Sequence, residues 1–252
     1  MLTMLTSNTR LRIASVLAII WIFYLILHFN ARAFFFPLLS VIMAVFFDLL
    51  ITYLRKRRWY LPTSSLVTGF LIGLILPTNS PWPLLLAAFI AVFSKQFIRI
   101  REHQHLFNPA ALGIFVTSLL TGVPVAWWAV SWTPWVIPII IGVSYTLYQL
   151  KRLWLPLTFL ALYALYRATF VEFESLISSL LDGTLFLFVF IMLPEPITSP
   201  ANKRWRYLFG PLVGLFVILL ERVGAFVLPD LFLPALLIGN IIGFLAKRSA
   251  RA

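Results

Sequence analysis

The sequence contains no cysteine, and this absence removes several kinds of chemistry at once. Without thiols the chain cannot form disulfides, ligate an iron–sulfur cluster or use a cysteine nucleophile. Histidine is scarce too: there are 3, and none forms a spaced pair within an apolar run, as a bis-His haem would need. The sequence also contains no dinucleotide-binding fingerprint, P-loop, zinc-protease motif or Ser/His/Asp arrangement. We therefore expect no metal site in this chain.

Charged residues make up only 11% of the chain, whereas soluble domains carry roughly 25%. The hydrophobic share is 62%, the mean hydropathy is +0.98, and apolar runs fill nearly the whole sequence. This composition is typical of a polytopic membrane protein and excludes a soluble core. The first apolar run, 11–29, is too long for the apolar part of a signal peptide, and no Ala-x-Ala site follows it. We therefore expect no cleavable signal.

Ten apolar segments predict an all-α polytopic membrane protein with about ten transmembrane helices in a single transmembrane domain. The segments are 11–29, 33–54, 64–79, 82–98, 109–121, 135–150, 153–170, 181–194, 207–228 and 231–247. A helix that spans the hydrocarbon core needs ~20 residues. Three segments, 64–79, 109–121 and 181–194, are shorter. Short segments indicate tilted helices, re-entrant halves or helices broken by proline.

Positive charge is distributed unevenly along these segments. If the N-terminus lies in the cytoplasm, all of the 20 lysines and arginines except Arg32, Arg167 and Arg222 fall at the cytoplasmic side. The positive-inside rule then predicts a multi-pass protein of the prokaryotic inner membrane with both termini in the cytoplasm. The net charge of +12 is spread over six separate cytoplasmic segments, so we expect no nucleic-acid partner.

Two proline-containing motifs recur five segments apart and suggest an internal repeat. Leu76–Pro81 closes the third segment as Leu193–Pro200 closes the eighth, and Phe107–Leu112 opens the fifth as Phe232–Leu237 starts the tenth. An odd offset reverses direction, which predicts two inverted-topology five-helix repeats with a site near the membrane midplane between them. The repeats would cover 11–130 and 131–247. The alternative is coincidence, because such dipeptides are common in membrane proteins.

The tetrapeptide Phe107-Asn108-Pro109-Ala110 predicts the start of a helix. Pro109 suits the first helical turn, and the Asn108 side chain can accept from the N–H groups that lack a partner there. The basic stretch 95–101 precedes this start and would face the positive end of the helix dipole. That arrangement is unfavourable unless an anion binds. The alternative is a capped transmembrane helix next to charges that set the topology.

Polar residues inside apolar segments are functional candidates in a membrane protein. Asp48 lies near the basic end of its segment, where we expect it to pair with the Arg55–Arg58 cluster. Lys95 ends the fourth segment and can extend its ammonium group to the interface. Thr68 and Asn240 can donate hydrogen bonds across a helix bundle.

Two other stretches could contact a ligand. Pro194–Pro200 holds three prolines, which exclude continued helix, together with Glu195 and Thr198. It forms either a rigid elbow or the lip of a binding site. Four tryptophans gather in a predicted outer loop, either as part of an aromatic belt or as a stacking surface for a flat ring. They are Trp127, Trp128, Trp132 and Trp135.

These motifs, in this order, resemble the D-type membrane subunits of the Rnf electron-transport complex and the B-type membrane subunits of the sodium-pumping NADH:quinone oxidoreductase (Nqr). The likeness rests on Thr68–Pro77, Lys95, Phe107–Ala110 and Leu193–Pro200, although Pro-Glu-Pro replaces the Thr-Asp-Pro of better-known members. It implies ten transmembrane helices and membrane electron transfer with flavin, FMN or riboflavin, often coupled to ion movement. It also implies membrane lipid and other redox subunits or flavin-carrying proteins as partners. The cofactor-binding candidates are Thr68, Lys95, Asn108, Pro109, Glu195 and Thr198.

In the family, FMN is esterified to a threonine in a Ser-Gly-Ala-Thr motif, which this sequence lacks. The nearest match is Ser131-Trp132-Thr133-Pro134, where bulky Trp132 precedes the candidate Thr133. We therefore expect flavin to be held non-covalently or by a partner. Two other functions stay open: an ion or small-molecule transporter on the same scaffold, and a non-catalytic membrane anchor for redox partners.

The charge distribution makes a prediction about topology. Reporter fusions should report the cytoplasm after Arg58, Arg101, Arg152 and Arg206, because these loops hold most of the positive charge. Fusions should report the outside near Pro81, Trp132, Glu174 and Asp230. Paired phosphatase and fluorescent-protein fusions make the measurement. One well-expressed fusion on the wrong side would contradict the ten-helix topology.

Overall fold

The computed structural model describes residues 9–101, 104–130, 136–200, 202–224 and 227–249. This part of the chain is mostly helical and divides into two compact units. Unit 1 comprises residues 1–105 and 109–130, and unit 2 comprises residues 106–108 and 131–252. One small antiparallel hairpin is an exception to the all-α expectation.

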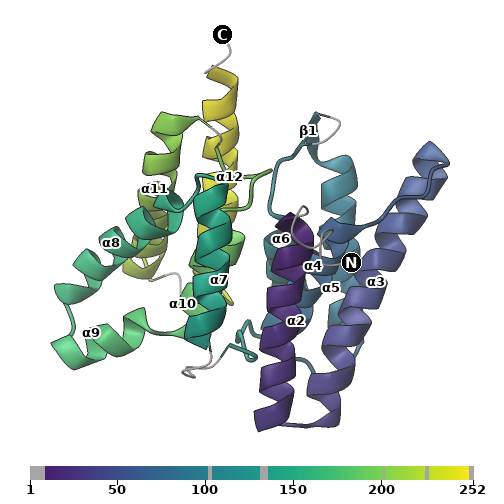
Figure 1. Cartoon of the computed structure of the whole chain (residues 1–252), viewed down its shortest axis with the longest axis horizontal. Coiled ribbons are helices and arrows are strands. Elements are labelled where there is room, and N and C mark those ends of the chain that lie inside the picture. Colours follow the sequence, from purple (N-terminus) through teal and green to yellow (C-terminus); the bar gives the residue numbers. More distant parts are fainter. Residues whose placement is uncertain (1–8, 102–103, 131–135, 201, 225–226, 250–252) are drawn as a thin grey trace. The chain divides into compact units, whose positions relative to one another are not determined.

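Unit 1 is built from long and short helices that lie side by side (Figure 1). Its helices are α2 Thr9–Leu27, α3 Ala31–Lys56, α4 Thr63–Ile75, α5 Trp82–Phe97 and α6 Pro109–Thr121. The hairpin, β1 Arg99–Arg101 with β2 Gln104–His105, follows α5. Helix α3 packs against both α4 and α5, and α5 packs against α6. The start of α6 at Pro109 confirms the helix start predicted from the tetrapeptide.

The ends of α3 illustrate how the sequence fixes a helix. Asn30 is the N-cap, and its side chain accepts from the Ala33 N–H at 2.7 Å. Arg55 and Lys56 lie in the last turn, where positive charges interact favourably with the negative end of the helix dipole. Arg57 then adopts the left-handed conformation (φ 52°) and ends the helix.

Glycine lets α3 and α4 approach to backbone contact. A Cβ atom at Gly73 would lie 2.5 Å from the Cα of Pro37, and one at Gly69 would lie 2.5 Å from the Cα of Val41. The Ser40 hydroxyl uses this proximity to donate to the Gly69 carbonyl at 2.7 Å. Small residues at such contacts are the usual means by which helices associate in membranes, where no hydrophobic force drives them together.

Unit 2 contains the remaining helices. They are α7 Val136–Gln149, α8 Trp154–Ala168, α9 Phe173–Leu180, α10 Gly183–Leu187, the π-helical turn η1 Phe188–Met192, α11 Lys203–Arg222 and α12 Phe232–Ser249. Helix α11 packs against α8 and α12. Gly210 permits the first contact, because a Cβ atom there would lie 2.3 Å from the Leu155 carbonyl oxygen.

A π-helical turn marks the point where the eighth apolar segment ends. The Leu193 N–H donates to the Phe188 carbonyl at 2.9 Å, five residues back, and turns continue through the proline-rich stretch. Such turns inside helices are frequently found at functional sites. Helix α9, which precedes this segment, is an amphipathic helix that the apolar pattern did not predict.

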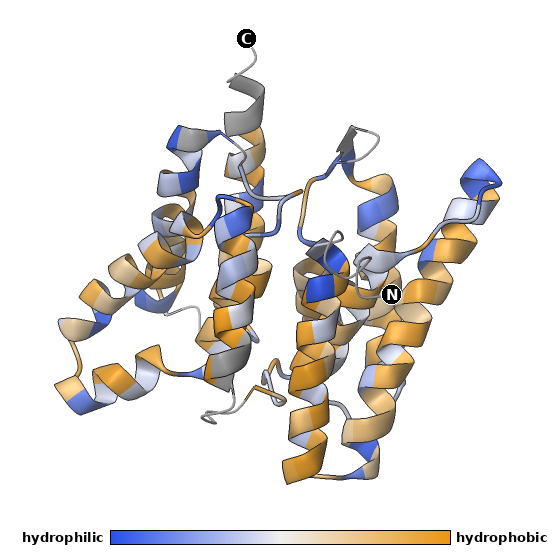
Figure 2. Ribbon diagram, in the orientation of Figure 1, coloured by the Kyte–Doolittle hydropathy of each residue, from blue (hydrophilic) through white to orange (hydrophobic). Residues whose placement is uncertain are grey.

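Helices overlie all ten predicted apolar segments, but their lengths differ. Among the described helices, α2 and α3 are long and apolar enough to cross a membrane, and α9 with α10 and η1 form a pair bent by 45° that passes the same test together. Figure 2 shows the hydrophobic residues along the bodies of α2 and α3. The ten crossings and the inverted repeat stay predictions.

The close contact between α3 and α4 predicts that Gly73→Ala destabilises the protein. The new Cβ would press on the Pro37 backbone, and overpacking of this kind costs about 1–3 kcal/mol of unfolding free energy. Gly142→Ala is the matched control, because nothing lies within 4 Å of its Cβ position. Without a clash, that change should stabilise helix α7 slightly. Denaturant unfolding in detergent, followed by circular dichroism, compares the two. Equal stability of both variants would contradict the contact.

Candidate functional site

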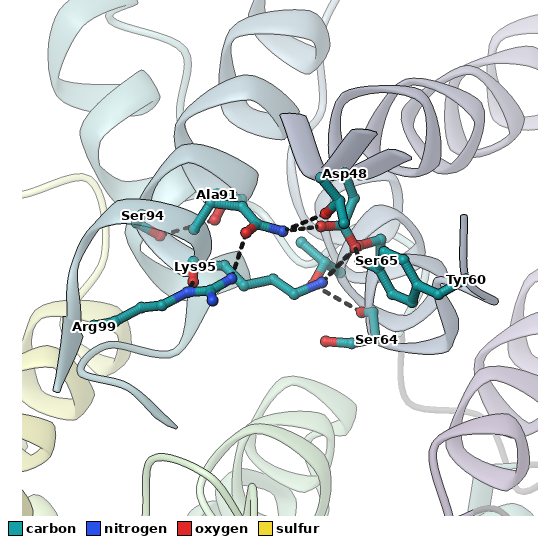
Figure 3. Close-up of polar contacts among 11 residues, drawn as sticks. Asp48, Tyr60, Ser64, Ser65, Ala91, Ser94, Lys95 and Arg99 are labelled. Atoms are coloured by element: carbon teal, nitrogen blue, oxygen red, sulfur yellow. Dashed lines mark hydrogen bonds and ion pairs between the residues drawn. The ribbon is translucent and has the colours of Figure 1, made fainter. Parts of the chain in front are cut away.

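A buried carboxylate from α3 organises the polar interior of unit 1 (Figure 3). Asp48 is 0% exposed and accepts hydrogen bonds from side chains on three other segments. The donors are the Tyr60 hydroxyl, the Ser65 hydroxyl at 2.5 Å, the Lys95 ammonium at 2.6 Å and the Gln96 amide at 2.6 Å. Asp48, Tyr60, Ser65, Lys95 and Gln96 together form the Asp48 cluster.

Lys95 and Asp48 form an ion pair inside this cluster. The Nζ atom of Lys95 lies 2.6 Å from Oδ2 of Asp48 and also donates to the Ser65 hydroxyl at 2.9 Å. The side chain of Lys95 is 12% exposed, so both charges are largely removed from solvent. Such a pair persists only when its geometry is good and further hydrogen bonds satisfy the remaining atoms. The Asp48 cluster meets both conditions.

A second layer of contacts joins the cluster to the basic ends of α3 and α5. The Gln96 amide donates to the Thr52 hydroxyl at 3.0 Å, and its side-chain oxygen accepts from the Arg99 guanidinium. Arg99 also donates to the Lys95 carbonyl at 2.7 Å, while Arg55 donates to the Gln96 carbonyl at 2.6 Å. These arginines therefore hold the backbone of α5 and contact neutral oxygens.

Tyr60 supplies a donor from the loop between α3 and α4. Burial, and then its hydrogen bond to Asp48, raise the pKa of Tyr60 above its ordinary value. Its hydroxyl therefore stays protonated across the physiological range and keeps its donor role.

The structure corrects two predictions about these charges. Asp48 pairs with Lys95, and the Arg55–Arg58 cluster does not bind it, because Arg55 reaches Gln96 and lies over the Phe97 ring at 4.7 Å. The Lys95 ammonium binds Asp48 and is not extended toward solvent. Lys95 follows Ala88 and Ala91 on the buried face of α5 at helical spacing, so its side chain points inward.

The cluster partners Tyr60, Ser65 and Gln96 were missed by sequence reasoning. One signal for Ser65 was present: Asp48, Ser65 and Lys95 each lie at the basic end of their apolar segment. Alternating crossings would place all three at the same side of the membrane. Nothing in the local sequence singled out Tyr60 or Gln96.

Asn108 of the Asn-Pro-Ala motif forms a second buried contact, within unit 2. The backbone N–H of Asn108 donates to the side-chain oxygen of Asn240 at 2.9 Å, and its amide donates to the Met192 carbonyl at 3.5 Å, at the end of η1. Asn240, predicted as a donor, is thus an acceptor here. Its Nδ2 atom is buried and has no hydrogen-bond acceptor within the described part of the chain.

The proline-rich stretch is held by a buried arginine. Arg152 is 7% exposed, and it donates to the Ser199 hydroxyl and to the Pro196 carbonyl at 3.3 Å. Burial, and then the charge of Arg206, lower the pKa of Arg152 to about 10, while Glu195 opposes this shift. The guanidinium therefore stays charged at neutral pH. Thr198 donates to the Glu195 carboxylate at 3.2 Å, which joins these two candidates in one turn.

The other predicted positions have different surroundings. The hydroxyl of Thr68 donates to the Ser64 carbonyl at 3.0 Å. This bond lies within α4 and replaces the hydrogen bond that we expected across the bundle. Trp127 is buried, and Trp128 donates to the Gly73 carbonyl at 3.0 Å. Thr133, Trp132 and Trp135 lie outside the described residues.

The apolar helices and the buried ionisable groups define a multi-pass helical membrane protein. A match to the model of the NQR2, RnfD, RnfE family covers residues 4–139 and 127–250, and the chain therefore belongs to this family. The match confirms the resemblance found in the sequence motifs. It also supports a location in the prokaryotic inner membrane.

Three curated relatives are each named as the D subunit of an ion-translocating oxidoreductase complex. The protein from Buchnera aphidicola is 36% identical over 40% of this chain and 29% of its own length. The protein from Cellvibrio japonicus is 25% identical over 75% of this chain and 74% of its own. The protein from Citrobacter koseri is 31% identical over 50% of this chain and 35% of its own. The chain thus spans about a third of the length of two of these relatives.

The ion pair predicts non-additive effects of mutation. Lys95→Met should lower the unfolding free energy by about 3–5 kcal/mol, because it leaves the buried Asp48 carboxylate without its counter-charge. Adding Asp48→Asn to Lys95→Met should restore most of that loss. Denaturant unfolding in detergent compares Lys95→Met, Asp48→Asn and the double variant with the unmodified protein.

Arg58→Gln is the matched control. Arg58 is exposed just beyond the end of α3, and its loss should change stability by no more than about 0.5 kcal/mol. A double variant that is as unstable as the sum of the two single variants would show that Asp48 and Lys95 do not act as a pair.

Proposed function

We propose that the chain is a membrane subunit of a flavin-dependent, ion-translocating oxidoreductase complex of the Rnf type. Membership of the NQR2, RnfD, RnfE family carries this proposal, together with the name that its curated relatives share. In this proposal the chain crosses the inner membrane ten times as two inverted repeats, and both termini lie in the cytoplasm. Other subunits supply the electron donor and acceptor sites, and membrane lipid surrounds the helices.

The Asp48 cluster is the place for ion coupling in this proposal. Ionisable residues inside membrane segments commonly mark ion pathways and proton relays. Asp48 is a carboxylate with several neutral donors around it, and Lys95 is its one cationic partner among the described residues. A proton or a monovalent cation that reached Asp48 would compete with Lys95 for the same oxygen. Release of Lys95 would then weaken the contact between α3 and α5, and the pair would act as a switch between two states.

Flavin is the cofactor that the family implies, and the residues fit a non-covalent contact better than a covalent one. The sequence has no Ser-Gly-Ala-Thr motif, and Thr133 follows the bulky Trp132. In unit 2, the buried Nδ2 of Asn240 lacks an acceptor within the described residues, and the carbonyl oxygens of a flavin ring are acceptors. Asn240 and its neighbour Asn108 would therefore hold one polar edge of the ring.

When bound, flavin supplies the electron-transfer chemistry, while this chain supplies position and polar contacts. Asn108 joins α12 to the end of the π-helical turn, so the two amides are fixed before any ligand arrives. Asn240 is 0% exposed, which keeps water away from the contact.

A transporter on the same scaffold is the second candidate. The buried Asp48–Lys95 pair favours it as much as it favours redox coupling, because ionisable groups inside the membrane commonly mark substrate and ion pathways of both kinds. The two functions differ in whether flavin is present.

Flavin retention tests the proposal. The protein, expressed with its partner subunits and a flavin transferase and purified in detergent, should show visible flavin absorbance, and denaturation in SDS should release that flavin from this polypeptide. Asn240→Ala should lose most of this flavin. Asn202→Ala is the matched control, because Asn202 caps α11 through the Arg204 N–H at 3.0 Å and should cost only ~1 kcal/mol of stability.

Two outcomes would contradict this assignment. A flavin-fluorescent band that persists in SDS and disappears in Thr133→Ala would show covalent attachment at Thr133. Absence of flavin from the assembled complex, together with tight binding of a solute, would favour the transporter.

A further inference from the structure

Unit 2 contains an ion pair that the proposed function does not use. Arg167, in the last turn of α8, donates to the carboxylate of Glu221, in the last turn of α11, at 3.5 Å. The next residue of α11, Arg222, lies over the ring of Phe170, just beyond α8, at 4.0 Å. Two cationic side chains therefore join the C-terminal ends of these helices.

This pair occupies the same place in unit 2 that Asp48 and Lys95 occupy in unit 1. Helices α3 and α5 are the second and fourth of the ten apolar segments, while α8 and α11 are the seventh and ninth, five segments later. Asp48 and Arg167 precede the first proline motif of their repeat by almost the same number of residues, and Lys95 and Glu221 precede the second motif equally closely. Only the signs are exchanged. Both halves of the chain thus place an ion pair between corresponding helices.

The pair in unit 2 is the more easily opened of the two. Its partners are 3.5 Å apart and their side chains are 27% and 29% exposed, whereas Asp48 and Lys95 are 2.6 Å apart and largely buried. The Nε atom of Arg167 is buried without an acceptor in the described part of the chain. Long, solvated pairs contribute little to stability. Stability therefore explains this pair poorly, and a small competing interaction is enough to separate it.

A second carboxylate lies in the same region. Asp182 accepts from the Thr184 N–H at 2.9 Å at the start of α10, and it lies within electrostatic range of Tyr163, as do Arg167 and Glu221. A cation that approached these oxygen atoms would meet negative charge and would compete with Arg167 for the Glu221 carboxylate. The competition has the form already described at Asp48, where Lys95 is the group displaced.

We propose that Arg167 and Glu221 form the outer gate of the ion path. This inference rests on the proposed function and its topology, in which α8 and α11 end at the outer side and α3 and α5 end at the cytoplasmic side. The gate is closed while Arg167 holds Glu221, and it opens when a proton or a monovalent cation takes the carboxylate. The Asp48–Lys95 pair is its inner counterpart, and alternate opening of the two pairs moves the ion.

Ion transport by the assembled complex in proteoliposomes tests the gate. Sodium tracer and a pH-sensitive dye measure uptake and identify the ion, and electron transfer is measured separately with an ionophore present. Glu221→Gln should lower ion uptake about tenfold, a size typical of coupled sites, while electron transfer persists. Arg167→Gln should also lower it, because the gate no longer closes. Exchanging the two residues, Arg167→Glu with Glu221→Arg, should restore most of the uptake, since the pair is re-formed.

Glu174→Gln is the matched control. It neutralises another carboxylate of the predicted outer side, on the exposed surface of α9, and should leave uptake unchanged. Denaturant unfolding verifies that all variants are folded. Unchanged uptake in Glu221→Gln would overturn the gate, and so would an equal loss of uptake and electron transfer, which indicates a structural role. An exchanged variant as inactive as the single variants would overturn the pairing.

Thiol labelling tests the location of the gate. Glu221→Cys would be the single cysteine of this chain, and a membrane-impermeant maleimide should label it from the outer side of intact cells. Labelling only after the membrane is permeabilised would overturn the outer location together with the proposed topology. Electron transfer without ion uptake by the unmodified complex would instead overturn the proposed ion translocation. Normal uptake that is insensitive to Glu221→Gln would overturn the gate alone.

Discussion

The arrangement of unit 1 depends on the ion pair between Asp48 and Lys95. An isolated charge is very costly inside a membrane protein, and the cost falls only when a counter-charge and hydrogen bonds surround it. Asp48 belongs to α3, its counter-charge to α5, and the Ser65 hydroxyl that bridges the two to α4. All three helices must be in place before the carboxylate is satisfied. The pair therefore specifies which helices become neighbours.

Close helix packing is the condition that makes this cluster geometrically feasible. Aspartate and serine side chains are short, so the helix backbones that carry them must approach closely. Gly69 and Gly73 remove the Cβ atoms that would keep α3 and α4 apart, and Gly113 does the same between α6 and the Ala87 carbonyl of α5. The glycine contacts and the Asp48 cluster thus support each other: the first sets the spacing, and the second selects the partners.

Local patterns in the sequence predicted the local structure well and the partners poorly. Apolar runs located the apolar helices, and Pro109 located the start of α6, because both depend on neighbours in the chain. The partner of Asp48 depends on which face of α5 is buried, and the arginine cluster next to it in sequence was the wrong choice. The contact between Asn108 and Asn240 joins residues far apart in the chain, so only the fold reveals it. The family resemblance indicated Lys95 and Asn108, but not what they contact.

Stability alone does not account for a buried ion pair. Replacing such a pair by apolar residues of similar volume is often neutral or stabilising, so a protein that needed only a packed bundle would do as well with leucine or methionine at these positions. In the described part of unit 2, the one ion pair seen, Arg167 with Glu221 at 3.5 Å, is partly exposed and long. The Asp48–Lys95 pair is shorter and more buried than this one. In the proposed ion-translocating complex, the pair would supply ionisable groups inside the membrane, and such residues commonly mark ion pathways.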